Sequence, residues 1–223
     1  MLVLEIINID ILPLRVADSA QTALSSMKEY KVDELPIVDH TTRKLIGMVS
    51  KESLMDNESG KVSLFAVRRR KPITTSPDEH VFDVAKTMML NNLKLIPVVD
   101  EKENFLGVVL RSELYKALSE MLNVSEHGSV ITIEQQEHDF SLSEVVRIIE
   151  SENAKILGIA VQPPNKISDH FRLSIKLNLT DLSRVKAALS RYNFIIIQDS
   201  GNTQTDSGEY EDRADEFIRF LDL

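Results

Sequence analysis

Leu35-Pro36-Ile37-Val38-Asp39 decides the fold, because the chain repeats this stretch as Ile96-Pro97-Val98-Val99-Asp100. A second stretch, Gly47-Met48-Val49-Ser50-Lys51-Glu52-Ser53-Leu54, returns as Gly107-Val108-Val109-Leu110-Arg111-Ser112-Glu113-Leu114. The offsets are 61 and 60 residues, so the copies differ by one residue in the turn between the motifs. A repeated unit of this size usually packs on its twin, because it cannot bury its apolar face alone. Such packing leaves two quasi-equivalent clefts, where small ligands can bind.

Each copy is expected to contain two helices and two short strands. In the first copy, apolar residues at helical spacing predict a helix over 20–30, followed by strands over 35–39 and 45–50. Ser50 can cap the next helix, because its hydroxyl accepts from free first-turn amides. In the second copy, Ser76-Pro77-Asp78-Glu79 predicts a helix start, because proline and acidic residues favour the first turn.

The segment 57–71 connects the two copies and contains Val62–Val67, which could form a strand. It ends in the basic run Arg68-Arg69-Arg70-Lys71. Two interpretations of this run stay open: a solvated linker edge, or a phosphate-facing strip between the repeats. DNA binding is a third, minor interpretation.

The periodicity changes after 123–128, which the sequence predicts to be a linker. The following elements are strands and helices in the order β-α-β-β-α-β, a ferredoxin-like arrangement. Its third strand, 171–179, alternates cleanly between apolar and polar residues, as a half-buried strand does. The last segment, 199–223, carries eight acids and two arginines, and its end, 209–223, has the spacing of an amphipathic helix.

Composition excludes several functional classes. The chain has a net charge of −9, which argues against non-specific binding to nucleic acid or to an anionic membrane. It has no cysteine, so disulfides, thiol chemistry and thiolate zinc sites are excluded. No window is apolar enough to span a membrane, and the first residues lack a signal-peptide pattern, so a cytoplasmic location is expected.

The doubled motifs over 1–122 resemble a tandem pair of CBS domains, and the β-α-β-β-α-β segment resembles an ACT domain. The combination is similar to bacterial CBS–ACT proteins, including those named acetoin-utilisation accessory proteins. The predicted fold class is therefore α/β (α+β): a tandem CBS pair, a ferredoxin-like βαββαβ ACT domain and a C-terminal helix. The expected boundaries are 1–61 and 62–124 for the CBS domains, 128–198 for the ACT-like domain and 199–223 for a flexible linker and helix.

The resemblance implies an adenine nucleotide between the two CBS motifs. In the family, a Thr or Ser after the glycine motif and an Asp three residues later hold the ribose. The first copy has Ser50 and Ser53 at these positions, and the second copy has Leu110 and Glu113, so neither copy keeps both groups.

The remaining site residues follow from the same resemblance. In the second copy, Thr74 and Thr75 enter the repeat, Ile96 and Pro97 frame the base, and Arg111 meets phosphate at a helix N-terminus. In the first copy, the corresponding residues are Leu35, Pro36, Ser50 and Lys51. The alternative is that Ser50 is a helix cap and that Ser53 and Glu113 are solvated first-turn residues. No cofactor is required, and AMP, ADP, ATP or S-adenosylmethionine is the regulatory ligand implied.

ACT domains often bind amino acids beside the turn between the first strand and helix, which in the family is typically Asp-x-Pro-Gly. Here Phe140 falls at the glycine position, where its bulk can fill the ligand pocket. Asp139 is expected to cap the following helix at its N-terminus, and Asn153 is expected to cap it at its C-terminus. Amino-acid binding at this turn stays open as an alternative.

Catalytic patterns are missing from the sequence. Its five histidines lack metal-ligand spacing, and it has neither a glycine-rich phosphate loop nor a Gly-x-Ser-x-Gly elbow. We therefore expect no catalytic and no metal-binding residues.

The predicted function is that of a cytoplasmic, non-catalytic regulatory protein. It would sense an adenosine-type ligand in the CBS pair and relay occupancy through the geometry of a homodimer to an unknown effector protein. Nucleic acid and membranes are not expected partners. Two alternatives stay open: a ligand-free scaffold whose tail helix recruits an effector, or amino-acid sensing by the ACT-like domain.

Overall fold

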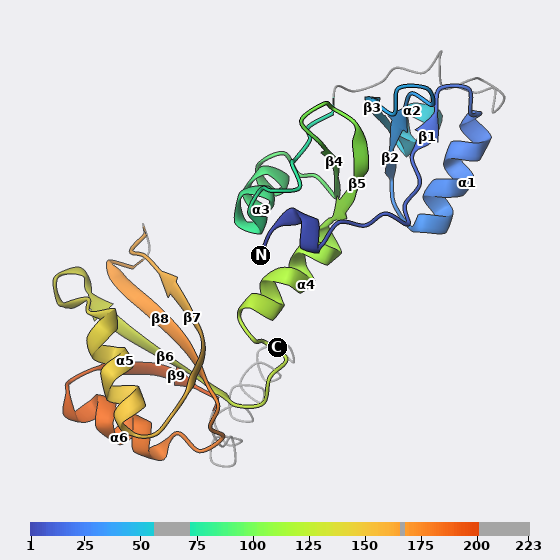
Figure 1. Ribbon diagram of the computed structural model, residues 1–223. Coiled ribbons are helices and arrows are strands. Elements are labelled where there is room, and N and C mark those ends of the chain that lie inside the picture. Colours follow the sequence, from blue (N-terminus) through green and yellow to red (C-terminus); the bar gives the residue numbers. More distant parts are fainter. Residues whose placement is uncertain (56–71, 166–167, 201–223) are drawn as a thin grey trace, which may run out of the picture. The chain divides into compact units, whose positions relative to one another are not determined.

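The computed structural model describes residues 1–55, 72–165 and 168–200 (Figure 1). The chain divides into two compact units, Met1–Leu118 and Ser119–Leu223. The basic run 68–71, the expected strand Val62–Val67 and the expected C-terminal helix lie outside the described residues.

The first copy of the repeat forms a three-stranded sheet with two helices. Its elements are β1 (Leu14–Arg15), α1 (Ala20–Tyr30), β2 (Glu34–Val38), β3 (Leu45–Ser50) and α2 (Lys51–Met55). β1 is parallel to β2, and β2 is antiparallel to β3. The helix over 20–30 and the strand over 45–50 therefore have the bounds that the periodicity predicts.

The second copy repeats this arrangement. Its elements are α3 (Val81–Leu90), β4 (Leu95–Val99), β5 (Phe105–Leu110) and α4 (Arg111–Met121). β4 and β5 are antiparallel, and a parallel bridge between Thr75 and Val98 takes the place of β1.

The start of α3 corrects one expectation. Ser76–Glu79 is a turn, and the helix begins at Val81 with His80 as its N-cap residue. The carbonyl of Pro77 accepts a hydrogen bond from the backbone N–H of Leu4 at 2.9 Å. In a helix that began at Ser76, this carbonyl would instead accept a hydrogen bond within the first turns of the helix. This contact comes from a segment more than 70 residues away, which explains why local sequence signals placed the start too early.

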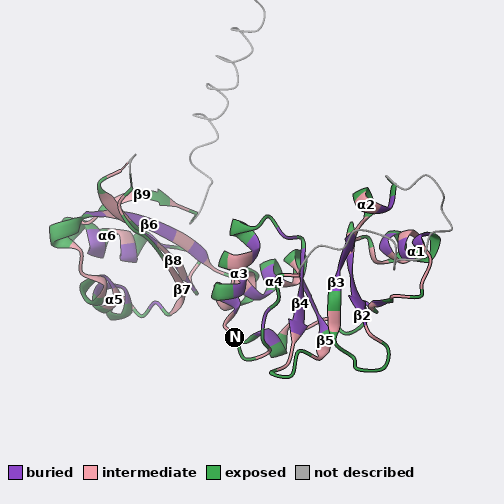
Figure 2. Ribbon diagram, turned by 90° about the horizontal axis from the view of Figure 1, so that it is seen from above, coloured by how far each residue is buried: buried purple, intermediate pink, exposed green. Residues whose placement is uncertain are grey.

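The two copies share one core, as the repeat predicts. Leu95 and Val108 of the second copy belong to the same buried cluster as the strands and helices of the first. Figure 2 shows the buried residues of β2, β3, β4 and β5 in neighbouring strands. The turns of the two copies also pair, because the backbone N–H of Phe105 donates to the carbonyl of Arg43 at 3.0 Å.

An N-terminal segment, residues 1–8, runs along the second copy instead of the first. The backbones of Asn8 and Val108 exchange hydrogen bonds of 2.7 and 3.0 Å. A Cβ atom at Gly107 would lie 2.7 Å from the carbonyl oxygen of Asn8, so glycine permits this close approach. The glycine of the second repeated motif therefore serves to dock the N-terminus.

An aspartate closes the turn after the repeated strand in both copies. The carboxylate of Asp39 accepts the backbone N–H of Thr42 at 2.7 Å. The carboxylate of Asp100 accepts the backbone and side-chain N–H groups of Asn104, both at 2.8 Å. These hydrogen bonds lower the pKa of both aspartates, chiefly through Thr42 and Asn104 respectively.

We expect the double variant Asp39→Asn/Asp100→Asn to be less sensitive to acid than the wild type. A carboxyl whose pKa is lowered by folding stabilises the protein above its ordinary pKa of about 3.9. That contribution disappears as the pH falls through the folded-state pKa. Thermal unfolding followed between about pH 6 and about pH 3 measures the effect. The wild type should lose its advantage over the variant as the pH falls, whereas a constant difference contradicts the prediction. Asp10→Asn, at an exposed position, is the control.

The second unit is a four-stranded antiparallel sheet covered by two helices on one face (Figure 1). The sheet order is β7-β8-β6-β9. The elements are β6 (Ser129–Gln136), α5 (Leu142–Ser151), β7 (Ile156–Gln162), β8 (His170–Leu177), α6 (Ser183–Arg191) and β9 (Ile195–Asp199). This is the β-α-β-β-α-β order that the sequence predicts.

Alternation along β8 builds the core of the second unit. Leu173, Ile175 and Leu177 are fully buried against α5 and α6, as their common face predicts. Phe171 continues this face, and its ring stacks on that of Phe140 with the centroids 4.2 Å apart. The bulky residue at the family's glycine position therefore packs against the sheet.

This aromatic contact corrects the expected start of α5. Asp139 lies in a short 3₁₀ turn and does not cap the helix, which begins at Leu142 with Ser141 as the N-cap residue. Because Phe140 packs on the sheet, the chain stays extended there and the helix starts after it. Asn153 follows the C-terminal end of α5 with a left-handed φ of 58°, the conformation that ends many helices.

Candidate functional site

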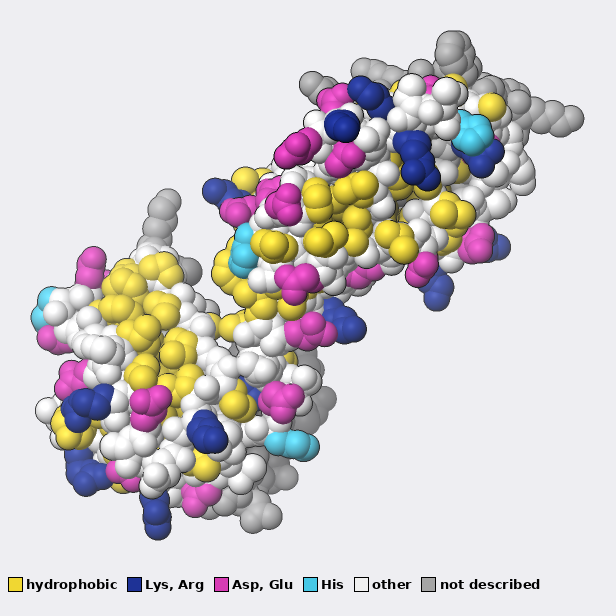
Figure 3. All heavy atoms as spheres, viewed as in Figure 1, with side chains coloured by type: hydrophobic (Ala, Val, Ile, Leu, Met, Phe, Trp, Pro, Cys, Tyr) yellow, Lys and Arg dark blue, Asp and Glu magenta, His cyan; other side chains and the backbone are white. Residues whose placement is uncertain are grey.

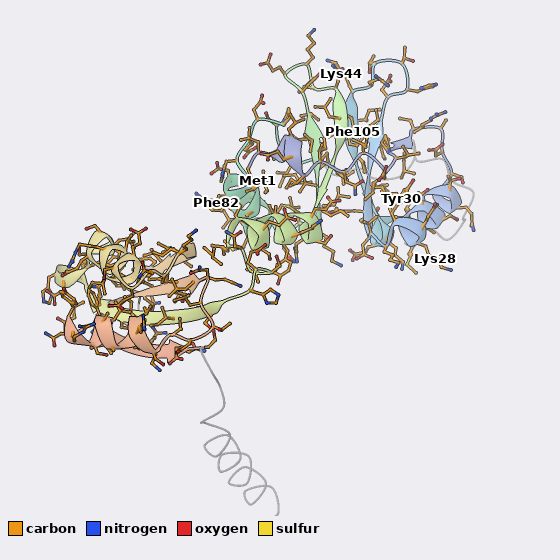
Figure 4. All side chains as sticks on the ribbon, turned by 60° about the horizontal axis from the view of Figure 1, so that its bottom comes forward. Met1, Lys28, Tyr30, Lys44, Phe82 and Phe105 are labelled. Carbon is orange, nitrogen blue, oxygen red and sulfur yellow. The ribbon has the colours of Figure 1, made fainter. Side chains whose placement is uncertain are left out.

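A hollow opens in the first copy beside the starts of β2 and α2. It consists of two adjoining cavities of about 460 and 410 Å³, which share Asp33, Lys51 and Met55. Apolar side chains line the larger cavity, namely Leu24, Met27, Val32 and Met55. Three lysines line it as well: Lys28, Lys31 and Lys51. Figure 4 shows Lys28 near the end of α1.

Local structure brings the three lysines together. Lys28 lies in the last turn of α1, where a cation interacts favourably with the helix dipole. Lys31 follows as the C-cap residue in a left-handed conformation. Lys51 begins α2, and its backbone N–H donates to the carbonyl of Asp33 at 2.7 Å.

Two acids, Asp33 and Glu52, line the hollow together with the three lysines. Among the described residues, none of the three forms an ion pair with an acid. The nearby carboxylate of Asp33 is bound by Lys94 at 2.5 Å, and the Lys94 hydrogen bond and charge lower the pKa of Asp33, with a smaller contribution from Lys51. The hollow therefore combines an apolar lining with excess positive charge, which suits an anionic ligand that carries an apolar ring.

The structure places two of the predicted first-copy residues at this hollow. Ser50 and Lys51 line the smaller cavity, whereas Leu35 and Pro36 are buried in β2. The hydroxyl of Ser50 accepts the backbone N–H of Ser53 at 3.3 Å, and the hydroxyl of Ser53 donates to the carbonyl of Ser50 at 2.8 Å. Ser50 thus caps the start of α2, as the alternative interpretation holds, whereas Ser53 is half-buried and not the solvated residue that this interpretation expects.

In the second copy, the polar groups predicted to hold a ligand form bonds within the protein. The carboxylate of Glu113 accepts the side-chain amide of Asn8 at 2.5 Å and the backbone N–H of Leu110 at 2.9 Å. The guanidinium of Arg111 donates to the carbonyl of Leu93 at 2.6 Å. The side chains of Asn8, Arg111 and Glu113 thus join the N-terminal segment, β5, α4 and the connection between α3 and β4.

The remaining second-copy residues divide between the surface and the core. Thr74 is exposed, whereas Thr75 is buried and donates its hydroxyl to the carboxylate of Glu79 at 2.6 Å. Ile96 and Pro97 are buried in β4.

Sequence reasoning missed Lys28, Lys31 and Asp33 in the first copy and Asn8 in the second. The only local signal for Lys28 and Lys31 is that they lie three residues apart at the end of a helix, a spacing that makes their side chains neighbours. The contact of Asn8 with Glu113 spans 105 residues, so no local pattern announces it.

Two further findings concern metal binding and membrane spans in the described residues. No group of three or more His, Asp or Glu side chains in residues 1–55, 72–165 and 168–200 could hold a metal ion. Within the same ranges, no helix is long and apolar enough to cross a membrane.

A model of the CBS domain matches residues 3–60 and 65–120, which together make up just over half of the chain. The chain belongs to the CBS domain family. The matches coincide with the two copies of the repeat, so this CBS pair accounts for the doubled motifs.

Relatives of the CBS pair include proteins of different kinds. A protein of Methanocaldococcus jannaschii is 30% identical over 113 residues, which cover 47% of this chain and 41% of that protein. An inosine-5'-monophosphate dehydrogenase of Korarchaeum cryptofilum is 26% identical over 106 residues, 48% of this chain and 22% of the enzyme. The matched segment thus spans less than half the length of these relatives.

A solved structure has the same fold over about half of the chain. The CBS domain pair/ACT domain protein of Thermotoga maritima is 22% identical with a TM-score of 0.50, and the match covers 54% of this chain and 98% of that chain.

Proposed function

We propose that this CBS pair is a non-catalytic sensor that binds an anionic adenosine nucleotide in the hollow of the first copy. The observation that carries the proposal is the rim of Lys28, Lys31 and Lys51 around an apolar lining. The apolar side chains suit a purine ring, and the lysines suit its phosphates. The family resemblance supports an adenine nucleotide.

The same charges select among the adenosine compounds. S-adenosylmethionine carries a sulfonium cation, which the three lysines repel. AMP, ADP and ATP carry phosphates, and a charge-assisted hydrogen bond to one of them is worth roughly 1.5–3 kcal/mol. We therefore expect affinity to follow phosphate charge.

The two copies take different roles in this proposal. Glu113 and Arg111 of the second copy already bond to Asn8 and Leu93. A nucleotide would have to break these bonds, whose loss would leave a carboxylate and a guanidinium without partners. We therefore propose one nucleotide per chain, in the first copy.

We further propose that the second unit is an ACT-like regulatory domain and that the protein is a homodimer. β7 lies at the edge of its sheet, and apolar side chains are visible over β7 and β8 in Figure 3. Ile156 and Ile159 of this edge strand pack partly against the core of their own unit, and the more exposed Val161 continues the strand, whose free edge a second copy could cover. Light scattering at micromolar concentration tests this, and a monomer contradicts it.

Isothermal titration of the full chain with AMP, ADP, ATP and S-adenosylmethionine tests nucleotide binding. We expect binding of the phosphorylated compounds and at least about tenfold weaker binding of S-adenosylmethionine. Lys28→Gln and Lys51→Gln should each weaken nucleotide binding by about tenfold. Lys86→Gln on the exposed surface of α3 is the matched control and should change nothing.

Three results contradict the proposal. They are no binding of any nucleotide at millimolar concentration, preferred binding of S-adenosylmethionine, and an equal effect of Lys86→Gln. The first of them favours the ligand-free scaffold.

A further inference from the structure

A second hollow lies within the second unit and takes no part in the nucleotide proposal. It has a volume of about 410 Å³, within the range of small-molecule sites. Its walls come from the end of β6, the following turn, α5, the start of β8 and the connection from α6 to β9 (Figure 1). Gln135, Asp139, Glu144, Tyr192 and Phe194 are among the residues that line it.

Gln135 leaves one polar atom without a partner. The residue is only 7% exposed, and its Oε1 is buried with no hydrogen-bond partner. Buried side-chain oxygens nearly always accept a hydrogen bond, so a hydrogen-bond donor is expected beside this atom. Leaving it unsatisfied would cost roughly 1–3 kcal/mol.

The amide orientation of Gln135 is fixed by its other end. Its Nε2 donates to the carbonyl oxygen of Asp139 at 3.2 Å. Turning the amide over would place two oxygens against each other and break this bond. The free group is therefore an acceptor, and its missing partner must be an N–H or O–H donor.

The charge of the walls decides which donor fits. Asp139 and Glu144 contribute carboxylates, and none of the residues that line the hollow is lysine or arginine. Arg147 reaches Glu144 only at 4.0 Å, along the exposed surface of α5. A third lining acid, Glu134, is already paired with Arg172 at 2.6 Å. The carboxylate of Asp139 has His138 beside it at 3.2 Å, on the exposed side of the turn. With no lysine or arginine among the lining residues, the carboxylates of Asp139 and Glu144 favour a cation and repel an anion.

We propose that this hollow binds a small organic amine in its ammonium form, with an N–H donated to Oε1 of Gln135. Asp139 and Glu144 stabilise the positive charge. The ring of Phe194 offers apolar surface to the carbon chain of the amine, whereas Arg147 lies over one face of the Tyr192 ring, 5.5 Å from its centroid. A ligand that also carries a carboxylate is disfavoured, because no lysine or arginine lines the hollow to receive it and the lining His170 is already paired with Asp169 at 2.6 Å.

Nuclear magnetic resonance of the ¹⁵N-labelled full chain tests this site, with 1,4-diaminobutane as the probe. We expect its addition to shift the side-chain amide signals of Gln135 and the backbone signals around Asp139. 4-Aminobutanoate, which replaces one amine by a carboxylate, should bind at least about tenfold more weakly. Calcium chloride alone should cause no comparable shift, because no metal-binding group of three side chains occurs in the described residues.

Three variants locate the binding. Gln135→Met removes the acceptor at similar volume and should abolish the shifts around Asp139. Glu144→Gln changes an exposed residue that the fold does not need and should weaken binding by a few fold. Glu150→Gln lies on the same helix outside this hollow and is the matched control. If Gln135→Met fails to fold, Glu144→Gln and its control still decide the question.

Several results overturn the proposal. One is the absence of shifts with 1,4-diaminobutane at millimolar concentration, which would leave a bound water as the partner of Gln135. Others are equal binding of 4-aminobutanoate, a response to calcium alone, and equal effects of Glu144→Gln and Glu150→Gln.

Discussion

Leu173→Ala is expected to lower the free energy of unfolding of the second unit by about 2–5 kcal/mol. Leu173 lies on β8, between β7 and β6, and its side chain is 0% exposed. The truncation removes apolar contacts with α5 and α6 and leaves a cavity that β8, which is hydrogen-bonded to a strand on each side, cannot readily close. Hydrogen exchange of the full chain, followed by mass spectrometry on peptides from β6 and β8, measures the loss in the second unit alone.

Ile197→Ala is the matched control for this prediction. Ile197 lies on β9 of the same sheet, outside the edge that the proposed dimer covers, and it is 43% exposed. We expect its truncation to cost less than about 1 kcal/mol, because half-exposed positions have little cavity to create. Equal losses for the two variants would show that β8 does not carry the core.

The repeat is the part of this fold that the sequence predicts best. The doubled motifs predict the pairs β2 with β3 and β4 with β5. Each of these strands is an apolar run bounded by turn residues, which can be recognised without knowledge of distant contacts. The same holds for β8, whose alternation identifies Leu173, Ile175 and Leu177 as the buried face. In each case, the spacing of the apolar residues along the chain matches the structural repeat of the element that it predicts.

Helix starts are harder to predict, because distant contacts decide them. The turn before α3 is held by the N-terminal segment through Pro77 and Leu4, and the start of α5 is delayed by the contact of Phe140 with Phe171. Local capping signals were present in both places, but tertiary contacts overrode them.

The candidate sites show the same division. Ser50 and Lys51 were predicted from the motif and lie at the hollow of the first copy. Lys28 and Lys31 join them only because α1 ends beside α2, which the spacing of residues does not reveal. The sequence does not point to Gln135. Whether its side-chain oxygen has a hydrogen-bond partner depends on which groups lie beside it in the folded protein.

Gly128→Ala is expected to destabilise the second unit by at least about 2 kcal/mol, although the sequence suggests only a linker. Gly128 has a φ of 141°, which L residues rarely adopt. A Cβ atom there would lie 1.9 Å from the carbonyl oxygen of Leu177, so the backbone itself would have to move. That movement would pull on the neighbouring Ser129, which pairs with Leu177 where β6 begins.

Thermal unfolding and hydrogen exchange of β6 test this prediction against Ser125→Ala, at an exposed position of the same linker. The control should lie within about 0.5 kcal/mol of the wild type, because exposed positions without special backbone geometry tolerate substitution. If Gly128→Ala is as stable as Ser125→Ala, the end of the linker does not constrain the sheet. A clear loss would show that Asn123–Gly128 is a fitted part of the second unit. The side chain of Asn123, which donates to the carbonyl of Leu157 at 2.6 Å, supports that outcome.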